Sequence, residues 1–282
     1  MLIDYQFKFM KKIYEKIKHK LILKTIPKVK NFKEAYSYCN KKNALGYEFD
    51  FLCRYRFEKL SNYIKDNKGF IFPQSSDLLL YCIAYFLKEN KGIAPRIVDY
   101  GGACGENILF LKSIFGNDIL KSSFVIETKA QVKESKKWNY SKKINFSNDL
   151  KKVLDENKID IFFSSGSLNY IERPYEILSM IKNHKIPMIC LTRNNFSKEP
   201  KSFIQASNLA DNGFGEHIKK YGNQKIWYPC QSLNETKIKK IFNSEYKLML
   251  NASLNKTCLI KKDESYAKDL IFNIKSKYIS ES

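Results

Sequence analysis

The apolar positions along this chain follow one spacing before residue 90 and another after residue 95. In the first part they recur every three or four positions, which predicts amphipathic helices. The clearest series is Ile3, Phe7, Met10, Tyr14, Ile17 and Leu21. In the second part, short continuous apolar runs alternate with helical patterns, which predicts the buried strands of a mostly parallel sheet with helices packed on its faces. The expected strands are 96–99, 123–127, 160–168, 186–192, 246–251 and 257–260.

This change of spacing divides the chain into three parts. We expect a helical arm and cap over residues 1–90, an α/β domain over residues 91–262, and a helical tail over residues 263–282. Within the α/β domain, residues 194–230 show no regular spacing. Such a long irregular segment inside a compact domain commonly carries function.

The first predicted helix is strongly basic outside its apolar stripe, with lysines at positions 8, 11, 12, 16, 18 and 20. Three interpretations stay open: attachment to an anionic membrane surface, self-association through the stripe, or docking of the arm on its own domain. The most apolar stretch, 78–87, is shorter than a membrane span and contains Tyr81 and Tyr85. With no secretory signal evident, we expect the cytoplasm as the location, at the inner face of the membrane if the helix binds lipid.

The most informative segment is the sharp turn between the first predicted strand and the helix after it. Residues 96–107 read Arg-Ile-Val-Asp-Tyr-Gly-Gly-Ala-Cys-Gly-Glu-Asn, so an apolar strand reaches Asp99 and a run of small residues follows. Small residues at such a turn let the backbone approach a ligand closely. Glu106 occupies the third glycine position of a dinucleotide-binding turn, and no Gly-Lys-Ser/Thr follows. The spacing therefore excludes a dinucleotide site and a P-loop.

Two further strand ends bring polar side chains to the same edge of the predicted sheet. The second strand ends in Glu127, whose carboxylate can accept hydrogen bonds from both hydroxyls of a ribose. A later strand ends in Ser165, Gly166 and Ser167. It is expected beside the first strand, at the point where open α/β sheets bind ligands.

The polar pair Ser147 and Asn148 lies between these two strand ends in the sequence and has two open interpretations. In one, these side chains contact an adenine ring bound beside Glu127. In the other, one of them caps the helix predicted over 150–156 by accepting a backbone hydrogen bond.

Together these segments resemble class I S-adenosylmethionine-dependent methyltransferases, and in particular a branch found among bacterial surface-polysaccharide biosynthesis genes. That branch carries D-[FY]-G-G-A-x-G after its first strand, an acid after its second, an S-G-x-L-Q-Y-[LI]-x-x-P loop and a T-R pair that ends its fifth strand. The matching segments are Asp99–Gly105, Glu127-Thr128, Ser165–Pro174 and Thr192-Arg193. The resemblance covers residues 31–262, with Asn169 where glutamine is usual and Ala103 in place of the middle glycine of the broader superfamily.

This resemblance implies an α/β, Rossmann-like fold with a mostly parallel sheet, an antiparallel last strand and an N-terminal helical region. It implies S-adenosylmethionine as the cofactor and residues 194–230 as the acceptor side of the site. No metal is expected. The residues expected to hold the cofactor are Asp99, Gly101, Gly102, Ala103, Gly105, Glu127, Ser147, Asn148, Ser165, Gly166 and Ser167.

Charge and cysteine content change this picture little. The net charge is +21, but only five of the 50 basic residues are arginine. Nucleic-acid readers favour arginine for its paired donors, so nucleic acid is not an expected partner. The seven cysteines include no C-x-x-C pair. This pattern indicates a reducing compartment, without a zinc site or a disulfide framework.

Three residues are candidates for the chemistry itself. Methyl transfer from a sulfonium is an in-line displacement in which positioning supplies most of the rate enhancement. His217 is the first candidate for a general base on an acceptor hydroxyl, with a solvated loop histidine as the alternative. Tyr170 and Arg193 follow. Arg193 at a strand end can bind an anionic group of the acceptor, or it can form a structural ion pair.

We expect a methyltransferase that O-methylates a sugar or sugar-derived intermediate of surface-polysaccharide biosynthesis, with a small-molecule or glycan acceptor as its partner. The substrate follows from the resemblance alone. Two alternatives stay open: an RNA methyltransferase, because of the charge, and a non-catalytic protein that keeps the fold without the cofactor. The intact Asp99, Gly101, Gly105 and Glu127 argue against the second alternative.

Overall fold

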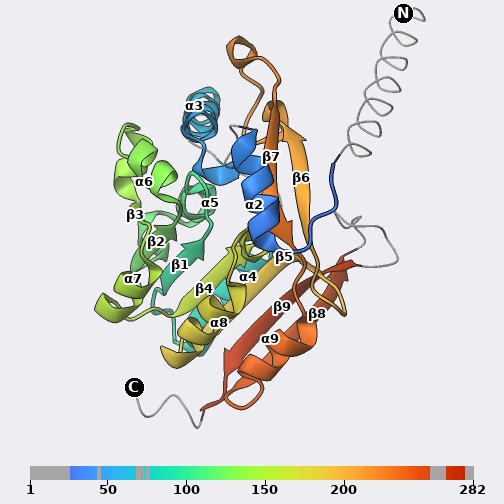
Figure 1. Cartoon of the computed structure of the whole chain (residues 1–282). Coiled ribbons are helices and arrows are strands. Elements are labelled where there is room, and N and C mark those ends of the chain that lie inside the picture. Colours follow the sequence, from blue (N-terminus) through green and yellow to red (C-terminus); the bar gives the residue numbers. More distant parts are fainter. Residues whose placement is uncertain are drawn as a thin grey trace, which may run out of the picture.

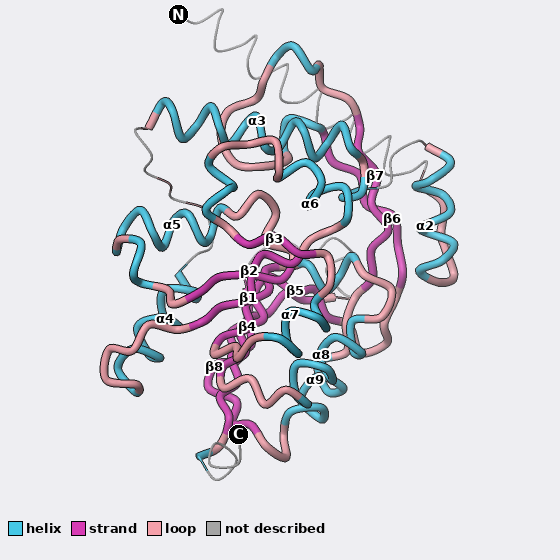
Figure 2. The backbone as a smooth tube through the Cα atoms, turned by 90° about the vertical axis from the view of Figure 1, so that its left-hand side faces the viewer, coloured by secondary structure: helices cyan, strands magenta, loops and turns pink. Residues whose placement is uncertain are grey.

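The computed structural model describes residues 26–42, 46–67, 71, 73, 77–254 and 265–276, which form a central β-sheet with helices on both faces (Figure 1). Figure 2 shows α4 (Asp77–Glu89) and α5 (Glu106–Phe115) on one side of the sheet. On the other side lie α7 (Leu150–Glu156), α8 (Pro174–Asn183) and α9 (Glu235–Phe242). None of the helices in the described ranges has both the length and the apolar character that a bilayer crossing requires. The helix expected over residues 3–21 lies outside the described residues.

Seven strands form the sheet in the order β3-β2-β1-β4-β5-β9-β8. Their bounds are β1 Arg96–Tyr100, β2 Ser122–Ile126, β3 Asn145–Ser147, β4 Ile161–Ser165, β5 Met188–Phe196, β8 Tyr246–Leu254 and β9 Tyr266–Ile274. The strands β1 to β5 pair in parallel, and β9 runs antiparallel to its neighbours β5 and β8. The expected α/β architecture, a mostly parallel sheet with an antiparallel last strand, is confirmed.

The inner strands read as continuous apolar runs because each face of the sheet has its own core. Ile97 of β1 and Ile161 of β4 belong to the core formed with α4 and α5. Their chain neighbours Val98 and Phe162 belong to the core formed with α7, α8 and α9. All four side chains are fully buried. Strands covered on both faces need apolar residues at successive positions, which is the pattern that marks them in the sequence.

The described part of the expected N-terminal cap is helical. The helix α2 (Phe32–Lys41) begins after Asn31, whose side-chain oxygen accepts a hydrogen bond from the Glu34 N–H at 3.0 Å. The helix α3 (Asp50–Asp66) lies beside α6 (Lys129–Ser135). Its residues Phe57 and Leu60 pack into the same core as α4 and α5. The cap is therefore joined to the α/β domain by a shared core.

The segment 194–230, expected to be irregular, contains regular structure. The strand β5 continues to Phe196, and β6 (Ser202–Asn208) pairs antiparallel with β7 (Lys225–Gln231) in a separate two-stranded sheet. The helix α2 covers the face of this ribbon that carries Ile204 and Trp227, whereas Ile226 and Tyr228 pack against Leu52 and Tyr55 of α3. The polar residues Gln205 and Ser207 interrupt the apolar pattern of β6 in the sequence, and Pro229 interrupts that of β7.

The expectation of a helical tail from residue 263 is wrong for Tyr266–Ile274, which forms β9. Leu270, Ile271 and Phe272 follow one another and are buried by the cores on both faces of the sheet. A peripheral helix would expose one of these successive positions, whereas an inner strand buries them all. The strand expected at 257–260 lies outside the described residues, and the sheet extends beyond the boundary expected at residue 262.

This assignment of β9 predicts that Leu270→Ala lowers the free energy of unfolding by about 3 kcal/mol, because it opens a cavity in a fully buried part of the core. Urea denaturation would measure the loss. The control is Lys247→Ala on the exposed edge of β8, for which we expect a change of about 0.5 kcal/mol or less. A loss for Leu270→Ala as small as that of the control would contradict the interior position of β9.

Candidate functional site

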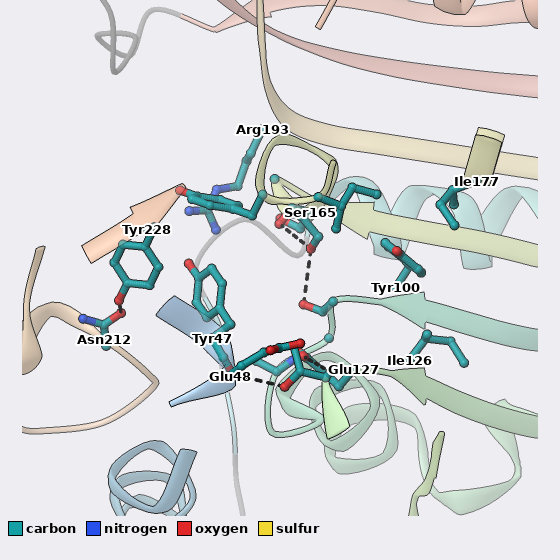
Figure 3. Close-up of a pocket in the computed structure, with 18 of the residues that line it drawn as sticks. Tyr47, Glu48, Tyr100, Ile126, Glu127, Ser165, Ile177, Arg193, Asn212 and Tyr228 are labelled. Atoms are coloured by element: carbon teal, nitrogen blue, oxygen red, sulfur yellow. Dashed lines mark hydrogen bonds between the residues drawn. The ribbon is translucent and has the colours of Figure 1, made fainter. Parts of the chain in front are cut away.

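The turns that follow β1, β2, β4 and β5 open into one cavity of about 1360 Å³ at the carboxyl-end edge of the sheet (Figure 3). Its opposite wall comes from outside the main sheet, from the 3₁₀ turn η1 (Gly46–Glu48), α3, the β6–β7 ribbon and the loop 211–215. In open parallel sheets, ligands bind at this edge between strands whose connections leave in opposite directions. The strands β1 and β4 are such a pair, which makes this cavity the candidate site.

The turn after β1 admits only glycine at two successive positions. A Cβ atom added to Gly101, which has φ +70°, would lie 2.0 Å from the Oγ atom of Ser167. A Cβ atom added to Gly102 would lie 2.4 Å from the carboxyl carbon of Asp99. Both glycines line the cavity. The missing side chains therefore bring the backbone of the turn to the cavity surface.

A carboxylate at the end of β2 holds this turn in place. The Oε1 atom of Glu127 accepts a hydrogen bond from the Ala103 N–H at 2.9 Å, and its Oε2 atom accepts one from the Thr128 N–H at 2.9 Å. Ala103 has φ +54°, a left-handed conformation that is unfavourable for alanine. Burial raises the pKa of Glu127, and the nearby Arg56 opposes that rise. The hydrogen bond that Ala103 donates to Glu127 thus fixes a strained residue at the cavity wall.

Asp99 lies behind this turn and is 1% exposed. Its Oδ2 atom accepts a hydrogen bond from Asn107 Nδ2 at 3.0 Å, whereas its Oδ1 atom is buried without a hydrogen-bond partner. Burial raises the pKa of this carboxyl to about 7, and the charges of Glu106 and Glu127 add to the rise. An unpartnered carboxylate oxygen behind a glycine favours a positively charged group on the cavity side of the turn.

The turns after β1 and β4 meet through Ser167. The Ser167 hydroxyl contacts the Gly101 carbonyl oxygen at 3.4 Å and that of Ser165 at 3.5 Å, as the dashed lines in Figure 3 mark. Gly166 adopts φ +71°, and its N–H donates to the Thr192 carbonyl at 2.8 Å. These contacts make Ser165, Gly166 and Ser167 the floor between the two turns.

Aromatic side chains form the other half of the cavity. The ring of Tyr47 lies 5.2 Å from that of Tyr170 and 4.8 Å from that of Tyr228, measured between centroids. The hydroxyl of Tyr170 donates to Gln205 Oε1 at 2.7 Å, and that of Tyr228 donates to Asn212 Oδ1 at 2.5 Å. Burial raises the pKa of the Tyr170 hydroxyl well above its ordinary value. The tyrosines therefore stay protonated and present ring faces and fixed hydroxyls to the cavity.

Arg193 enters the cavity from an irregularity in β5. The pairing of β5 with β9 shifts register between Leu191 and Asn194, and Arg193 within it has φ +58°. Its backbone N–H donates to Asp269 Oδ1 at 2.7 Å, which holds this unfavourable conformation. Figure 3 shows the Arg193 side chain on the same side of the cavity as Tyr228 and across from Glu127. Irregularities of this kind re-aim side chains toward ligands.

A buried lysine fixes the loop that closes the far wall. Lys59 of α3 is 3% exposed, and its ammonium donates to the carbonyl oxygens of Ala210, Asn212 and Gly213 at 2.9, 3.0 and 3.2 Å. An ammonium has three N–H donors, so all of them are used. The loop and α3 are thereby joined through one side chain.

The structure brings most of the sequence-predicted residues to the cavity. Those that line it are Gly101, Gly102, Ala103, Glu127, Asn148, Ser165, Gly166, Ser167, Tyr170 and Arg193. Asp99, Gly105 and Ser147 do not line it. Asp99 and Gly105 lie under the turn, and Ser147 forms hydrogen bonds with Asp149 through its hydroxyl. The cap of α7 is Asp149, not Ser147 or Asn148.

His217, the first candidate for a general base, also lies outside the cavity lining. Its Nδ1 atom is 2.8 Å from the hydroxyl of Tyr55, with which it shares a hydrogen bond. The loop that carries His217 does contribute to the lining, but through its earlier residues 211–215. Its assignment as a base stays a prediction that this position does not support.

Several lining residues were not predicted from the sequence: Tyr47, Arg56, Asn107, Gln205, Asn212 and Tyr228. For Asn107 a signal existed, because it follows the glycine turn on the first turn of α5. The others come from the cap, the ribbon and the loop 211–215, which the fold brings to the cavity from far away in the chain. Among the residues that the structure describes, no group of three or more His, Cys, Asp or Glu side chains is arranged to hold a metal ion.

No family model matches the chain, and no curated protein matches it. Among solved structures, it is similar to an S-adenosylmethionine-dependent methyltransferase from Clostridium acetobutylicum ATCC 824, with 12% identity, a TM-score of 0.44, and coverage of 68% of this chain and 89% of that one. It is also similar to the CcbJ methyltransferase from Streptomyces caelestis, with 8% identity, a TM-score of 0.42 and coverage of 69% and 89%. A third is the magnesium protoporphyrin IX methyltransferase from Synechocystis PCC 6803 with bound SAM, with 12% identity, a TM-score of 0.39 and coverage of 80% and 97%. Each is a partial likeness of the backbone.

The contacts of Lys59 predict that Lys59→Met destabilises the far wall of the cavity. Methionine keeps the volume but leaves three carbonyl oxygens without their charged donor. We therefore expect the free energy of unfolding to fall by about 2 kcal/mol or more. Hydrogen exchange of the amides in 209–215 should become faster. Lys65→Met, at an exposed position of the same helix, is the matched control. Equal exchange in the two variants would show that Lys59 does not hold the loop.

Proposed function

We propose that this protein is an S-adenosylmethionine-dependent methyltransferase that O-methylates a sugar or sugar-derived intermediate of surface-polysaccharide biosynthesis in the cytoplasm. The observation that carries the proposal is the hydrogen bond from the Ala103 N–H to Glu127 at 2.9 Å. It joins the glycine turn after β1 to a carboxylate at the end of β2, where a nucleoside ribose and its neighbouring groups can lie together.

The residues around the turn fit this cofactor. Gly101 and Gly102 present backbone to the cavity, because a Cβ atom on either would collide with Ser167 or Asp99, and the unpartnered Oδ1 atom of Asp99 lies behind Gly102. We assign the methionine portion to this turn, with its ammonium drawn by the Asp99 charge. We assign Glu127 to the ribose hydroxyls and Asn148, which also lines the cavity, to the adenine ring.

When bound, S-adenosylmethionine supplies a methyl group on a positively charged sulfur that is open to in-line attack. The contribution of the protein is then to position the acceptor oxygen and to exclude water. Ser165, Gly166 and Ser167 form the floor on which the reacting groups meet. Tyr170 orients the acceptor through its hydroxyl oxygen, which can accept a hydrogen bond because its one proton is donated to Gln205 and its raised pKa keeps it neutral.

The aromatic half of the cavity suits a sugar. The ring faces of Tyr47, Tyr170 and Tyr228 offer apolar surfaces for the C–H groups of a pyranose, and Gln205 offers an amide to its hydroxyls. Arg193 at the edge of this half can bind an anionic group of the acceptor, such as a phosphate or a carboxylate. The acceptor class itself comes from the sequence resemblance.

Isothermal titration calorimetry with S-adenosylhomocysteine tests the ribose assignment. We expect Glu127→Gln to weaken binding about tenfold to hundredfold, because it removes a charged acceptor from the ribose hydroxyls. Glu156→Gln, on the exposed face of α7, is the matched control and should bind like the unaltered protein. Unchanged binding by Glu127→Gln would refute the ribose assignment. No binding of either S-adenosylhomocysteine or S-adenosylmethionine at millimolar concentration would refute the enzyme class.

The raised pKa of Asp99, about 7, predicts the pH dependence of the same binding. Below pH 7 the free protein holds a proton on Asp99, and an incoming ammonium favours its release. Affinity for S-adenosylhomocysteine should therefore rise by up to about tenfold per pH unit as the pH rises toward 7, and level off above it. Titrations between pH 5.5 and 8.5 would measure this. Asp99→Asn should bind weakly and without the slope, and a wild-type dissociation constant independent of pH would contradict the assignment.

A further inference from the structure

Arg56 is a buried cation with no role in the reaction proposed above. It lies on α3, is 8% exposed and lines the cavity. Its Nε atom is buried without a hydrogen-bond partner. No ion pair or hydrogen bond joins its guanidinium to another described residue, although the ring of Tyr47 lies 5.3 Å from it. A buried guanidinium whose donors lack acceptors is costly unless a ligand supplies them.

The carboxylates whose charges act on Arg56 form their hydrogen bonds with backbone N–H groups and not with its guanidinium. Both oxygens of Glu127 accept backbone N–H groups, and the Oε2 atom of Glu106 accepts the Cys104 N–H at 2.9 Å. Their charges act on Arg56 at a distance and raise the pKa of its guanidinium against the opposing effect of burial. Arg56 is therefore held in its charged form beside the glycine turn, with its hydrogen-bonding capacity left for another partner.

The stem of Arg56 is fixed in place. A Cβ atom added to Gly213 would lie 3.0 to 3.3 Å from the Cγ, Cβ and Cα atoms of Arg56, so the loop passes directly over the stem. Lys59 holds that loop through three carbonyl oxygens. The guanidinium is thus positioned before any ligand arrives, which lowers the entropic cost of binding one.

We propose that Arg56 binds the carboxylate of the amino-acid portion of S-adenosylmethionine. This inference rests on the proposed function. The fork of N–H donors in a guanidinium matches a carboxylate in shape and charge. Asp99 and Arg56 lie near the same turn, so the ammonium and the carboxylate of one α-amino acid meet opposite charges there. An acidic group on the acceptor has the same chemistry, and the experiment separates the two sources.

The test compares two ligands that differ only in this group: S-adenosylhomocysteine and its decarboxylated analogue, S-adenosyl-3-thiopropylamine. In calorimetry, the unaltered protein should bind the first about tenfold to hundredfold more tightly. Arg56→Met should lose this preference by weakening the first ligand alone. Arg56→Lys, which keeps the charge without the fork, should retain part of it. Arg54→Met, at an exposed position two residues away, is the matched control and should keep the full preference.

Two results would overturn the proposal. If Arg56→Met kept the preference of the unaltered protein, the carboxylate would lie elsewhere and Arg56 would face the acceptor. If Arg56→Met weakened both ligands equally, its role would be structural. Thermal melting without ligand checks that each variant is folded. If Arg56→Met does not fold, the comparison is made with Arg56→Lys alone. Failure of the unaltered protein to bind either ligand would instead refute the proposed function.

Discussion

The carboxylate of Glu127 holds together the two turns on which the cavity depends. Its oxygens accept the N–H groups of Ala103 and Thr128, and its own N–H donates to the Ser147 carbonyl at 2.9 Å. One residue at the end of β2 therefore connects β1, β2 and β3 at the edge where parallel strands converge. It also holds Ala103 in a conformation that costs alanine on the order of 1 kcal/mol. Such strain persists only where surrounding contacts determine the backbone.

The charged groups around the glycine turn are mostly acidic, whereas the net charge of the whole chain is positive. The chain carries a net charge of +21, yet the glycine turn is surrounded by Asp99, Glu106 and Glu127, with Arg56 beside them. Charges on the surface are screened by salt, whereas buried charges act across short distances with little screening. The buried set therefore determines which ligand charge is favoured at the turn. The abundant surface lysines contribute to solubility and to encounters with anions.

The parts of the site that follow one another along the chain were predictable, and the parts assembled by packing were not. Asp99, the glycine turn and Glu127 share a local pattern, because each strand end has its own apolar run and polar terminus. Arg56 carries no such signal, since its buried position depends on the loop near Gly213, far away in the sequence. The ribbon β6–β7 was missed because Pro229 and polar residues interrupt its apolar pattern. The strand β9 was missed because its continuous apolar run is only the three residues Leu270 to Phe272, too short to distinguish a strand from a helix.

The interior position of β9 determines when the last strands of the sheet can pair during synthesis. The strand β9 is the last described strand in the chain, yet it lies between β5 and β8 and pairs with both. During synthesis β8 leaves the ribosome before its hydrogen-bonding partner exists, and the edge of β5 stays open until residue 274 has emerged. Exposed strand edges favour association between chains. The half of the sheet beyond β5 can therefore close only after translation has passed β9, so early release or stalling would leave two unpaired edges.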